Sequence, residues 1–315
     1  NIDPDSKIYF ITDQDFKSKY SENINSNDIS FQYIKELKEI DYFEGEQNPL
    51  WDTSLLRIFY LHNASKLLKI DSFVHFDLDV LIFKAFKDLK ENFQKNKLNI
   101  TPLNENFLIF GYSYVDGLKN YSNICSKILE ILENVNFYEK KYYNNNKLNE
   151  MVLLNIAYIE NPDMFNVLNT IPDGTSSILF DGISYGQYLG GIDKKRFSKK
   201  SINIAHYAGR SMQSKGFRPK FKSSRPYIKY NNKIYEIANL HIHKKKLNLN
   251  FEKTGMSSEH EVFFSSLSID NNKSISDILE IGTFDGYNAL LFSKLFEQSN
   301  IDTIDLLVTD DDFKN

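Results

Sequence analysis

The chain has 315 residues, a net charge of −4 at pH 7 and one cysteine, Cys125. This length is sufficient for two domains, and the mildly negative charge excludes the strong basic field that favours nucleic acid. A lone cysteine excludes an internal disulfide, so we expect a reducing, cytoplasmic location and interpret Cys125 as a small buried apolar residue. No apolar run approaches the ~20 residues of a membrane span, and the N-terminus shows no signal-peptide pattern.

Strands and helices are predicted to alternate along the first half of the chain. "KIYFITD" (residues 7–13) predicts a short buried strand, and "DTSLLRIFYLHNASKLL" (52–68) has the apolar spacing of a helix. The apolar run "VHFDLDVLIF" (74–83), which contains two aspartates, predicts the next strand. Two further amphipathic helices are predicted over residues 120–135 and 148–159.

The next segments contain two more predicted strands. "SILFDGISYGQYLGG" (177–191) predicts a strand that enters a glycine-rich loop, and "KIYEIANLHIH" (233–243) predicts another strand. Residues 194–233 are basic, with interleaved aromatics, and are predicted to be irregular. The alternation of strands and helices favours an α/β fold with a largely parallel sheet.

A change in composition near residue 250 predicts two domains, 1–250 and 251–315. In the second, "DILEIGTFDGYNALLFSKLF" (277–296) predicts a strand, a turn with glycines and a helix. "IDLLVTDDD" (304–312) predicts a second strand that ends in acidic residues. The second domain is therefore expected to be a partial Rossmann-like βαβ segment.

Asp77 and Asp79 are the most informative residues of the chain. In an extended strand, residues i and i+2 point to the same face, so the two carboxylates repel unless a cation lies between them. Carboxylate oxygens suit Mg²⁺ or Mn²⁺, which would neutralise a diphosphate leaving group. Two other interpretations compete: solvated aspartates at a frayed strand end, and the D-x-D start of a haloacid-dehalogenase phosphatase, which Val80 and Leu81 do not fit.

The D-x-D strand after a helix with Arg57 resembles GT-A glycosyltransferases. "FDGISYGQYLGG" and "NLHIHKK" resemble segments of a group of bacterial glycosyltransferases, so that the resemblance covers roughly residues 5–248. It implies a GT-A-like (Rossmann-type) mixed sheet flanked by helices. It also implies metal-dependent sugar transfer from a UDP- or GDP-sugar to a hydroxyl of a glycan or lipid-linked acceptor, in bacterial surface polysaccharide synthesis.

This resemblance assigns the donor and metal sites. Asp77 and Asp79 would bind the metal and the donor diphosphate, and Arg57 would face the donor nucleotide. His241 or His243, which point the same way along their strand, would supply a further metal ligand. His206 is a rival for this ligand, because His206, Gly209 and Lys215 resemble the H-x-x-G…K ending of other GT-A families.

The remaining assignments concern the sugar and the acceptor. Asp181 is interpreted as a general base or an acceptor-positioning carboxylate, or alternatively as a turn cap ahead of a glycine. Gln187, Gly190 and Gly191 would line the sugar pocket. Lys246, in a run of three lysines, would help to hold the diphosphate, unless the run is a solvated edge.

"DPDSKIYFITD" resembles the second strand of a GT-A domain, so we expect the first strand and helix of such a domain to be missing from this chain. The basic, aromatic segment over residues 195–230 would bind the acceptor, stack sugars, contact the inner face of a membrane, or form a plain loop. A rival hypothesis from another class is a non-catalytic sugar-nucleotide or glycan-binding module of a longer bifunctional protein.

"LEIGTFDGYNALLF" resembles the first motif of class I S-adenosylmethionine methyltransferases. The resemblance implies that Glu280, Gly282 and Gly286 form the cofactor turn and that Asp310, after the next strand, contacts the ribose. A generic βαβ start, including a nicotinamide site, is the alternative. Because a complete methyltransferase needs several more strands, we expect a truncated segment that does not bind S-adenosylmethionine.

Overall fold

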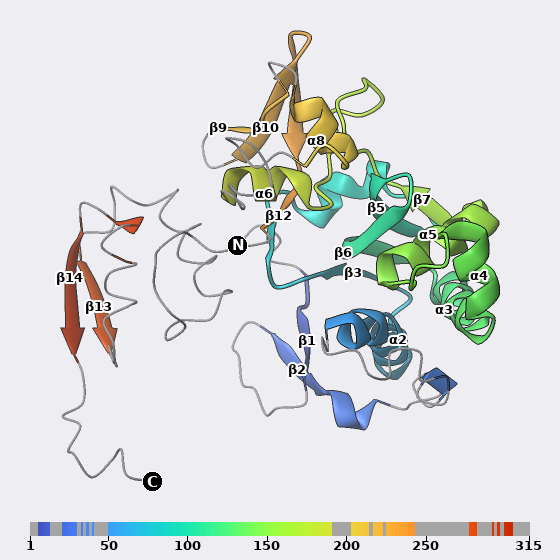
Figure 1. Cartoon of the computed structure of the whole chain (residues 1–315). Coiled ribbons are helices and arrows are strands. Elements are labelled where there is room, and N and C mark those ends of the chain that lie inside the picture. Colours follow the sequence, from blue (N-terminus) through green and yellow to red (C-terminus); the bar gives the residue numbers. More distant parts are fainter. Residues whose placement is uncertain are drawn as a thin grey trace, which may run out of the picture.

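A computed structural model describes the chain as a mixed α/β protein (Figure 1). The described residues are 6–12, 21–29, 50–190, 203–213, 217–222, 225–242, 277–281 and 299–304, with a few single positions between them. None of the helices in these ranges has the length and apolar character needed to span a bilayer. The division into domains at residue 250 stays a prediction.

The larger core lies between a four-stranded sheet and three helices. The sheet has the order β3 (Ser72–Phe76), β6 (Phe107–Asp116), β5 (Leu98–Asn104) and β7 (Phe165–Val167). The pairs β3–β6 and β5–β6 are antiparallel, and only β5–β7 is parallel. The prediction of a largely parallel sheet was therefore wrong for this sheet, because β5 and β6 form a hairpin across a two-residue turn.

Helices α2 (Leu50–Leu68), α3 (Leu118–Glu133) and α5 (Glu150–Glu160) confirm the three predicted helices. Apolar residues at helical spacing, such as Leu55, Ile58 and Phe59 of α2, are buried against this sheet. Cys125 of α3 is fully buried, and burial raises the pKa of its thiol, which confirms its interpretation as a buried apolar residue.

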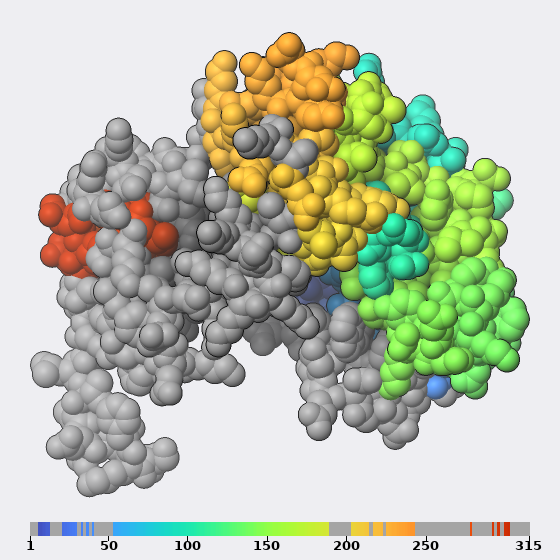
Figure 2. All heavy atoms as spheres, turned by 45° about the horizontal axis from the view of Figure 1, so that its top comes forward, coloured from blue at the N-terminus to red at the C-terminus, as the bar shows by residue number. Residues whose placement is uncertain are grey.

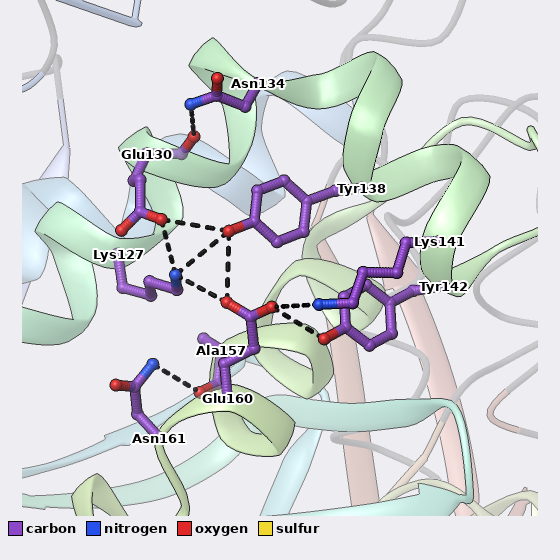
Figure 3. Close-up of polar contacts among 9 residues, drawn as sticks. All are labelled: Lys127, Glu130, Asn134, Tyr138, Lys141, Tyr142, Ala157, Glu160 and Asn161. Atoms are coloured by element: carbon purple, nitrogen blue, oxygen red, sulfur yellow. Dashed lines mark hydrogen bonds and ion pairs between the residues drawn. The ribbon is translucent and has the colours of Figure 1, made fainter.

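A polar network joins α3, α5 and the short helix α4 (Val135–Tyr142) on the surface (Figure 3). The Glu160 carboxylate lies between Lys127, at 2.7 Å, and Lys141, at 3.0 Å, and accepts hydrogen bonds from Tyr138 and Tyr142. These contacts hold the outer helices together away from the candidate site.

A second sheet has the order β8 (Ile178–Leu179), β11 (Lys233–Ile237), β10 (Arg225–Tyr230) and β9 (Lys220–Lys222). Helices α6 (Ser184–Gly190) and α8 (Tyr207–Met212) cover its apolar face. The basic segment was therefore wrongly predicted to be irregular. The sequence feature that indicates these strands is Asn231–Asn232. Their φ values of 48° and 59° match the type I′ turn that joins β10 and β11.

Two predicted strands are each divided in the structure. Residues 74–83 form part of β3 and the separate strand β4 (Val80–Ile82), and residues 233–243 form β11 and β12 (Asn239–His241). Strand β12 pairs with β4 in an antiparallel ladder. The chain therefore passes from one sheet to another at Asp77–Asp79.

The remaining elements are short. Strands β1 (Tyr9–Thr12) and β2 (Glu22–Asn25) form a parallel pair, which confirms a strand within residues 7–13. The 3₁₀ turns are η1 (Ser26–Asp28), η2 (Phe86–Asn92) and η3 (Pro162–Met164). Strands β13 (Asp277–Ile281) and β14 (Asn300–Ile304) are parallel, as a βαβ unit requires. The predicted strand over residues 304–312 overlaps β14 only at Ile304, and its residues from 305 onward lie outside the described residues.

Candidate metal site

The site forms at the break between β3 and β4. Strand β3 stays paired with β6 as far as Phe76, and the Asp77 N–H then donates to the Gly111 carbonyl at 2.8 Å. A turn follows, closed by the Val80 N–H donating to the Asp77 carbonyl at 3.0 Å. Asp77 and Asp79 were predicted to share the face of one continuous strand, and this was wrong. The turn instead directs them toward β12.

His241 completes a cluster with the two aspartates. His241 lies opposite Val80 in the β4–β12 ladder, and the Ile242 N–H donates to the Asp79 carbonyl at 2.8 Å. One ligand atom from each of Asp77, Asp79 and His241 lies within 4.8 Å of the other two. The tertiary ladder therefore brings together three residues that the sequence analysis had assigned to a metal.

The His241 ring is oriented for ligation through Nε2. Its Nδ1–H donates to the Gly182 carbonyl at 2.6 Å, and Nε2 lies 3.2 Å from Asp79 Oδ1. A neutral imidazole with Nδ1–H on a backbone carbonyl presents its Nε2 lone pair, which is the usual arrangement of a metal-binding histidine. The ring is 3% exposed, so its orientation is fixed by packing.

The charges in the cluster favour a cation. Burial acts to lower the pKa of His241, but the hydrogen bond and charge of Asp79, and the charge of Asp77, raise it above its ordinary value. A proton on His241 and a divalent cation would each neutralise part of the two carboxylates. The site therefore favours positive charge, whether as a proton on His241 or as a bound divalent cation.

Arg57, His75 and Glu150 surround one side of Asp77. Arg57 of α2 forms an ion pair with Asp77 Oδ1 through Nη1, and its Nη2 lies 2.9 Å from Glu150 Oε1. His75 Nε2 lies 3.3 Å from the same Asp77 oxygen, and its ring stacks on Phe110. Burial alone would raise the pKa of Asp77, but His75 and Arg57 hold it well below its usual range. Asp77 is therefore a fixed carboxylate whose Oδ1 contacts Arg57 and His75, while its Oδ2 lies beside Gly111, next to the His241 ring.

Arg57 was identified from the sequence, but His75 and Glu150 were not. His75 lies on β3, two residues before Asp77, which directly follows the end of that strand, so the i, i+2 spacing of the two residues was the available sequence signal. Glu150 begins α5 and is separated from Arg57 by 93 residues. Its side chain is 6% exposed, and a buried glutamate is rare without a partner, but no local pattern reveals that burial.

Gly111 forms one wall of the cluster. It lies in an irregular part of β6, where the pairing with β5 jumps from Ser113 to Ile109. A Cβ placed on Gly111 would lie 2.6 Å from His241 Cε1 and 2.8 Å from Asp77 Oδ2. Only glycine therefore leaves the space between these two side chains.

Asp181 has a structural role that corrects its assignment as a base. Its Oδ1 accepts the N–H groups of Ser184 and Tyr185, and its Oδ2 accepts those of Gly186 and His241, at 2.7 to 3.0 Å. Burial raises the pKa of Asp181 and these donors oppose the rise. With both oxygens occupied, Asp181 caps the first turn of α6 and anchors β12, a wider role than the turn cap of the alternative interpretation.

His206 lies outside the metal cluster. Its Nδ1 is 3.0 Å from Ser184 Oγ, and its Nε2 is 3.0 Å from the Asn203 amide nitrogen. Because the amide donates to Nε2, Nδ1 is the protonated nitrogen and donates to Ser184, so His206 is not a base for that serine. Burial lowers its pKa to about 4. The rival assignment of His206 as the metal ligand is therefore not supported, and the Lys215 of that motif lies outside the described residues.

The other assigned residues are only partly described. Gln187 and Gly190 lie in helix α6, so the predicted glycine-rich loop was wrong at these positions. Glu280 lies on β13. The remaining assignments fall outside the described residues: Gly191, His243, Lys246, Gly282, Gly286 and Asp310.

Two carboxylates and one imidazole suit Mn²⁺ and also accept Mg²⁺. Comparison of the chain with family models, curated proteins and solved structures finds no match. The fold and the site therefore define the molecule as a mixed α/β protein with a candidate Asp–Asp–His metal site.

Proposed function

We propose that the chain is a metal-dependent glycosyltransferase that moves a sugar from a nucleotide-sugar donor to a hydroxyl acceptor. The observation that carries the proposal is the cluster of Asp77, Asp79 and His241, whose ligand atoms lie within 4.8 Å of one another. It lies between the end of β3 and the β4–β12 ladder, which fixes the backbone on both sides of the two aspartates.

Each residue has a distinct part in this proposal. Asp79, His241 and the Oδ2 of Asp77 would hold Mn²⁺ or Mg²⁺. When bound, the cation supplies positive charge to a departing nucleoside diphosphate. Arg57 is 26% exposed at its side chain and holds Asp77 in place through Oδ1. Gly111 keeps the space between His241 and Asp77 open.

The proposal also includes an acceptor, a location and a biosynthetic role. A glycan or lipid-linked acceptor, a cytoplasmic location near the inner face of a membrane, and a part in bacterial surface polysaccharide synthesis remain parts of the proposal. So does a methyltransferase-like segment at the C-terminus, for which a calorimetric titration with S-adenosylmethionine should show no binding.

The test is release of nucleoside diphosphate from a panel of UDP- and GDP-sugars, with Mn²⁺ or with a chelator. We expect release from at least one donor with Mn²⁺, loss of release with chelator, and loss in Asp79→Asn. Release that is insensitive to both the chelator and the substitution would refute the metal role.

A second candidate function is a non-catalytic sugar-nucleotide or glycan-binding module. It is favoured by one observation: Asp181, the residue assigned as the base, is fully engaged with backbone N–H groups. Such a module would bind a donor in the presence of Mn²⁺ but release no diphosphate from any of the panel. Calorimetric binding without turnover would therefore support the module over the enzyme.

A further inference from the structure

The β8–β11–β10–β9 sheet has one apolar and one basic face. Along β9 and β10 the side chains alternate: Phe221, Pro226 and Ile228 face the core, whereas Lys222 and Lys229 are exposed on the other side. Figure 2 shows this part of the chain (orange) at the surface of the molecule. The exposed face is therefore formed by regular strands.

Four cations occupy this face, namely Lys220, Lys222, Arg225 and Lys229, and all are exposed. We call them the basic face. The register places Arg225 directly opposite Lys222, so two like charges are cross-strand neighbours. Such a pair is destabilising in water. Neither β9 nor β10 contains an acidic residue, and the nearby Glu236 of β11 is paired with Lys84.

Protection of a sheet edge explains only part of this pattern. β9 is the edge strand, where exposed lysines discourage pairing with other chains. That reason does not apply to Arg225 and Lys229, because β10 is paired on both sides, with β9 and with β11. The fold therefore does not require the exposed cations of β10, which is an interior strand.

An apolar side chain lies beside one of these cations. Ile234 of β11 is directly opposite Lys229 in the register and is 57% exposed. Tyr227, half-buried, lies between Arg225 and Lys229 on the same face. A row of cations that ends beside an exposed isoleucine and includes a tyrosine matches the interface of an anionic bilayer, where phosphates meet acyl chains. A nucleic-acid backbone would offer the phosphates but no apolar partner for Ile234.

We propose that the basic face docks the protein on a membrane surface that contains anionic phospholipids. The lysines and the arginine contact the headgroup phosphates, and Ile234 enters the boundary between headgroups and acyl chains. This inference stands apart from the proposed glycosyltransferase activity, because it uses residues that do not contact the metal cluster.

The test is co-sedimentation of the full chain with vesicles. The probes are vesicles of phosphatidylglycerol and phosphatidylethanolamine, vesicles of phosphatidylcholine alone, and a 20-nucleotide single-stranded DNA. We expect binding to the anionic vesicles that weakens as salt rises, and background sedimentation with phosphatidylcholine. Each cation near an anionic bilayer contributes about fivefold to partitioning. Changing all four residues of the basic face to glutamine should therefore weaken binding by more than about a hundredfold.

A matched control removes the same charge elsewhere. Lys66, Lys87, Lys90 and Lys119 are exposed and lie on other elements, so changing these four to glutamine keeps the net charge equal to that of the first variant. The control should retain vesicle binding, and Ile234→Ser should weaken it several-fold while the salt dependence stays the same. Circular dichroism verifies that each variant is folded.

Three results would overturn the proposal. One is no binding to anionic vesicles by the wild-type chain. Another is equal loss in the basic-face variant and in the control. The third is binding of the DNA, lost in the basic-face variant, with no binding of vesicles, which would make the face a nucleic-acid surface.

Discussion

Replacing Gly111 by alanine should disrupt the metal site and leave the fold intact. The added Cβ would lie 2.6 Å from His241 Cε1 and 2.8 Å from Asp77 Oδ2, whereas ordinary contacts begin near 3.4 Å. The imidazole would have to move by about 0.8 Å, from 2.6 to 3.4 Å, and the carboxylate by about 0.6 Å, from 2.8 to 3.4 Å. Ligand distances in metal sites tolerate only about 0.2 Å.

These displacements set the expected magnitudes. Mn²⁺ affinity should fall by about tenfold to a hundredfold, which is the range for loss of a residue that orients a metal ligand. Overpacking should reduce the free energy of unfolding by about 1–3 kcal/mol. The assays are calorimetric titration with Mn²⁺ and thermal unfolding of the apo chain.

Gly182→Ala is the matched control for this substitution. Its Cβ would approach no atom closer than 3.4 Å, the distance to Ile109 Cγ1, although Gly182 also contacts His241 through its carbonyl. The control should bind Mn²⁺ like the wild-type chain. Wild-type affinity in a folded Gly111→Ala variant would refute the reasoning, because it would show that the ligands do not need the space above Gly111.

Three further substitutions test the contacts around the site and the outer helices. Glu150→Gln removes the partner that shares Arg57 with Asp77, so Mn²⁺ affinity should fall about tenfold; an unchanged affinity would show that Glu150 does not position Asp77. Asp181→Asn turns an amide toward two backbone donors and should lower the free energy of unfolding by about 2–4 kcal/mol in urea titrations. Partial burial acts to raise the pKa of Glu160, but Lys127 and its other partners lower it to about 2, below its unfolded value of 4.5. Its contribution, about 1 kcal/mol at this partly exposed position, is therefore present above pH 4.5 and lost toward pH 2. Glu160→Gln should destabilise the chain at pH 7 and not at pH 2, and equal destabilisation at both would contradict this assignment.

Local periodicity was sufficient to predict the three helices α2, α3 and α5. The apolar spacing of residues 52–68 and 120–135 matches α2 and α3 because apolar residues of both helices are buried in the same core. The break at Asp77 was not predictable in this way. An apolar run gives no sign that its second half pairs with β12, which lies some 160 residues later in the chain.

Only part of the candidate site was predictable, because several of its contacts join residues that are far apart in the sequence. Asp77, Asp79 and His241 were assigned from motifs, and the structure brings them together. The role of Asp181 depended on which groups surround it, and the four N–H donors come from two elements that only the fold brings together. Glu150 was missed because its burial and its ion pair with Arg57 are tertiary.

The central claim is that Asp77, Asp79 and His241 bind one divalent cation. Pulsed electron paramagnetic resonance of the chain with one equivalent of Mn²⁺ tests it most directly, because nitrogen bonded to the ion modulates the signal. We expect one bound Mn²⁺ with a coordinated nitrogen, loss of that nitrogen signal in His241→Gln, and loss of binding in Asp79→Asn. An unchanged nitrogen signal in His241→Gln, or no binding by the wild-type chain, would contradict it.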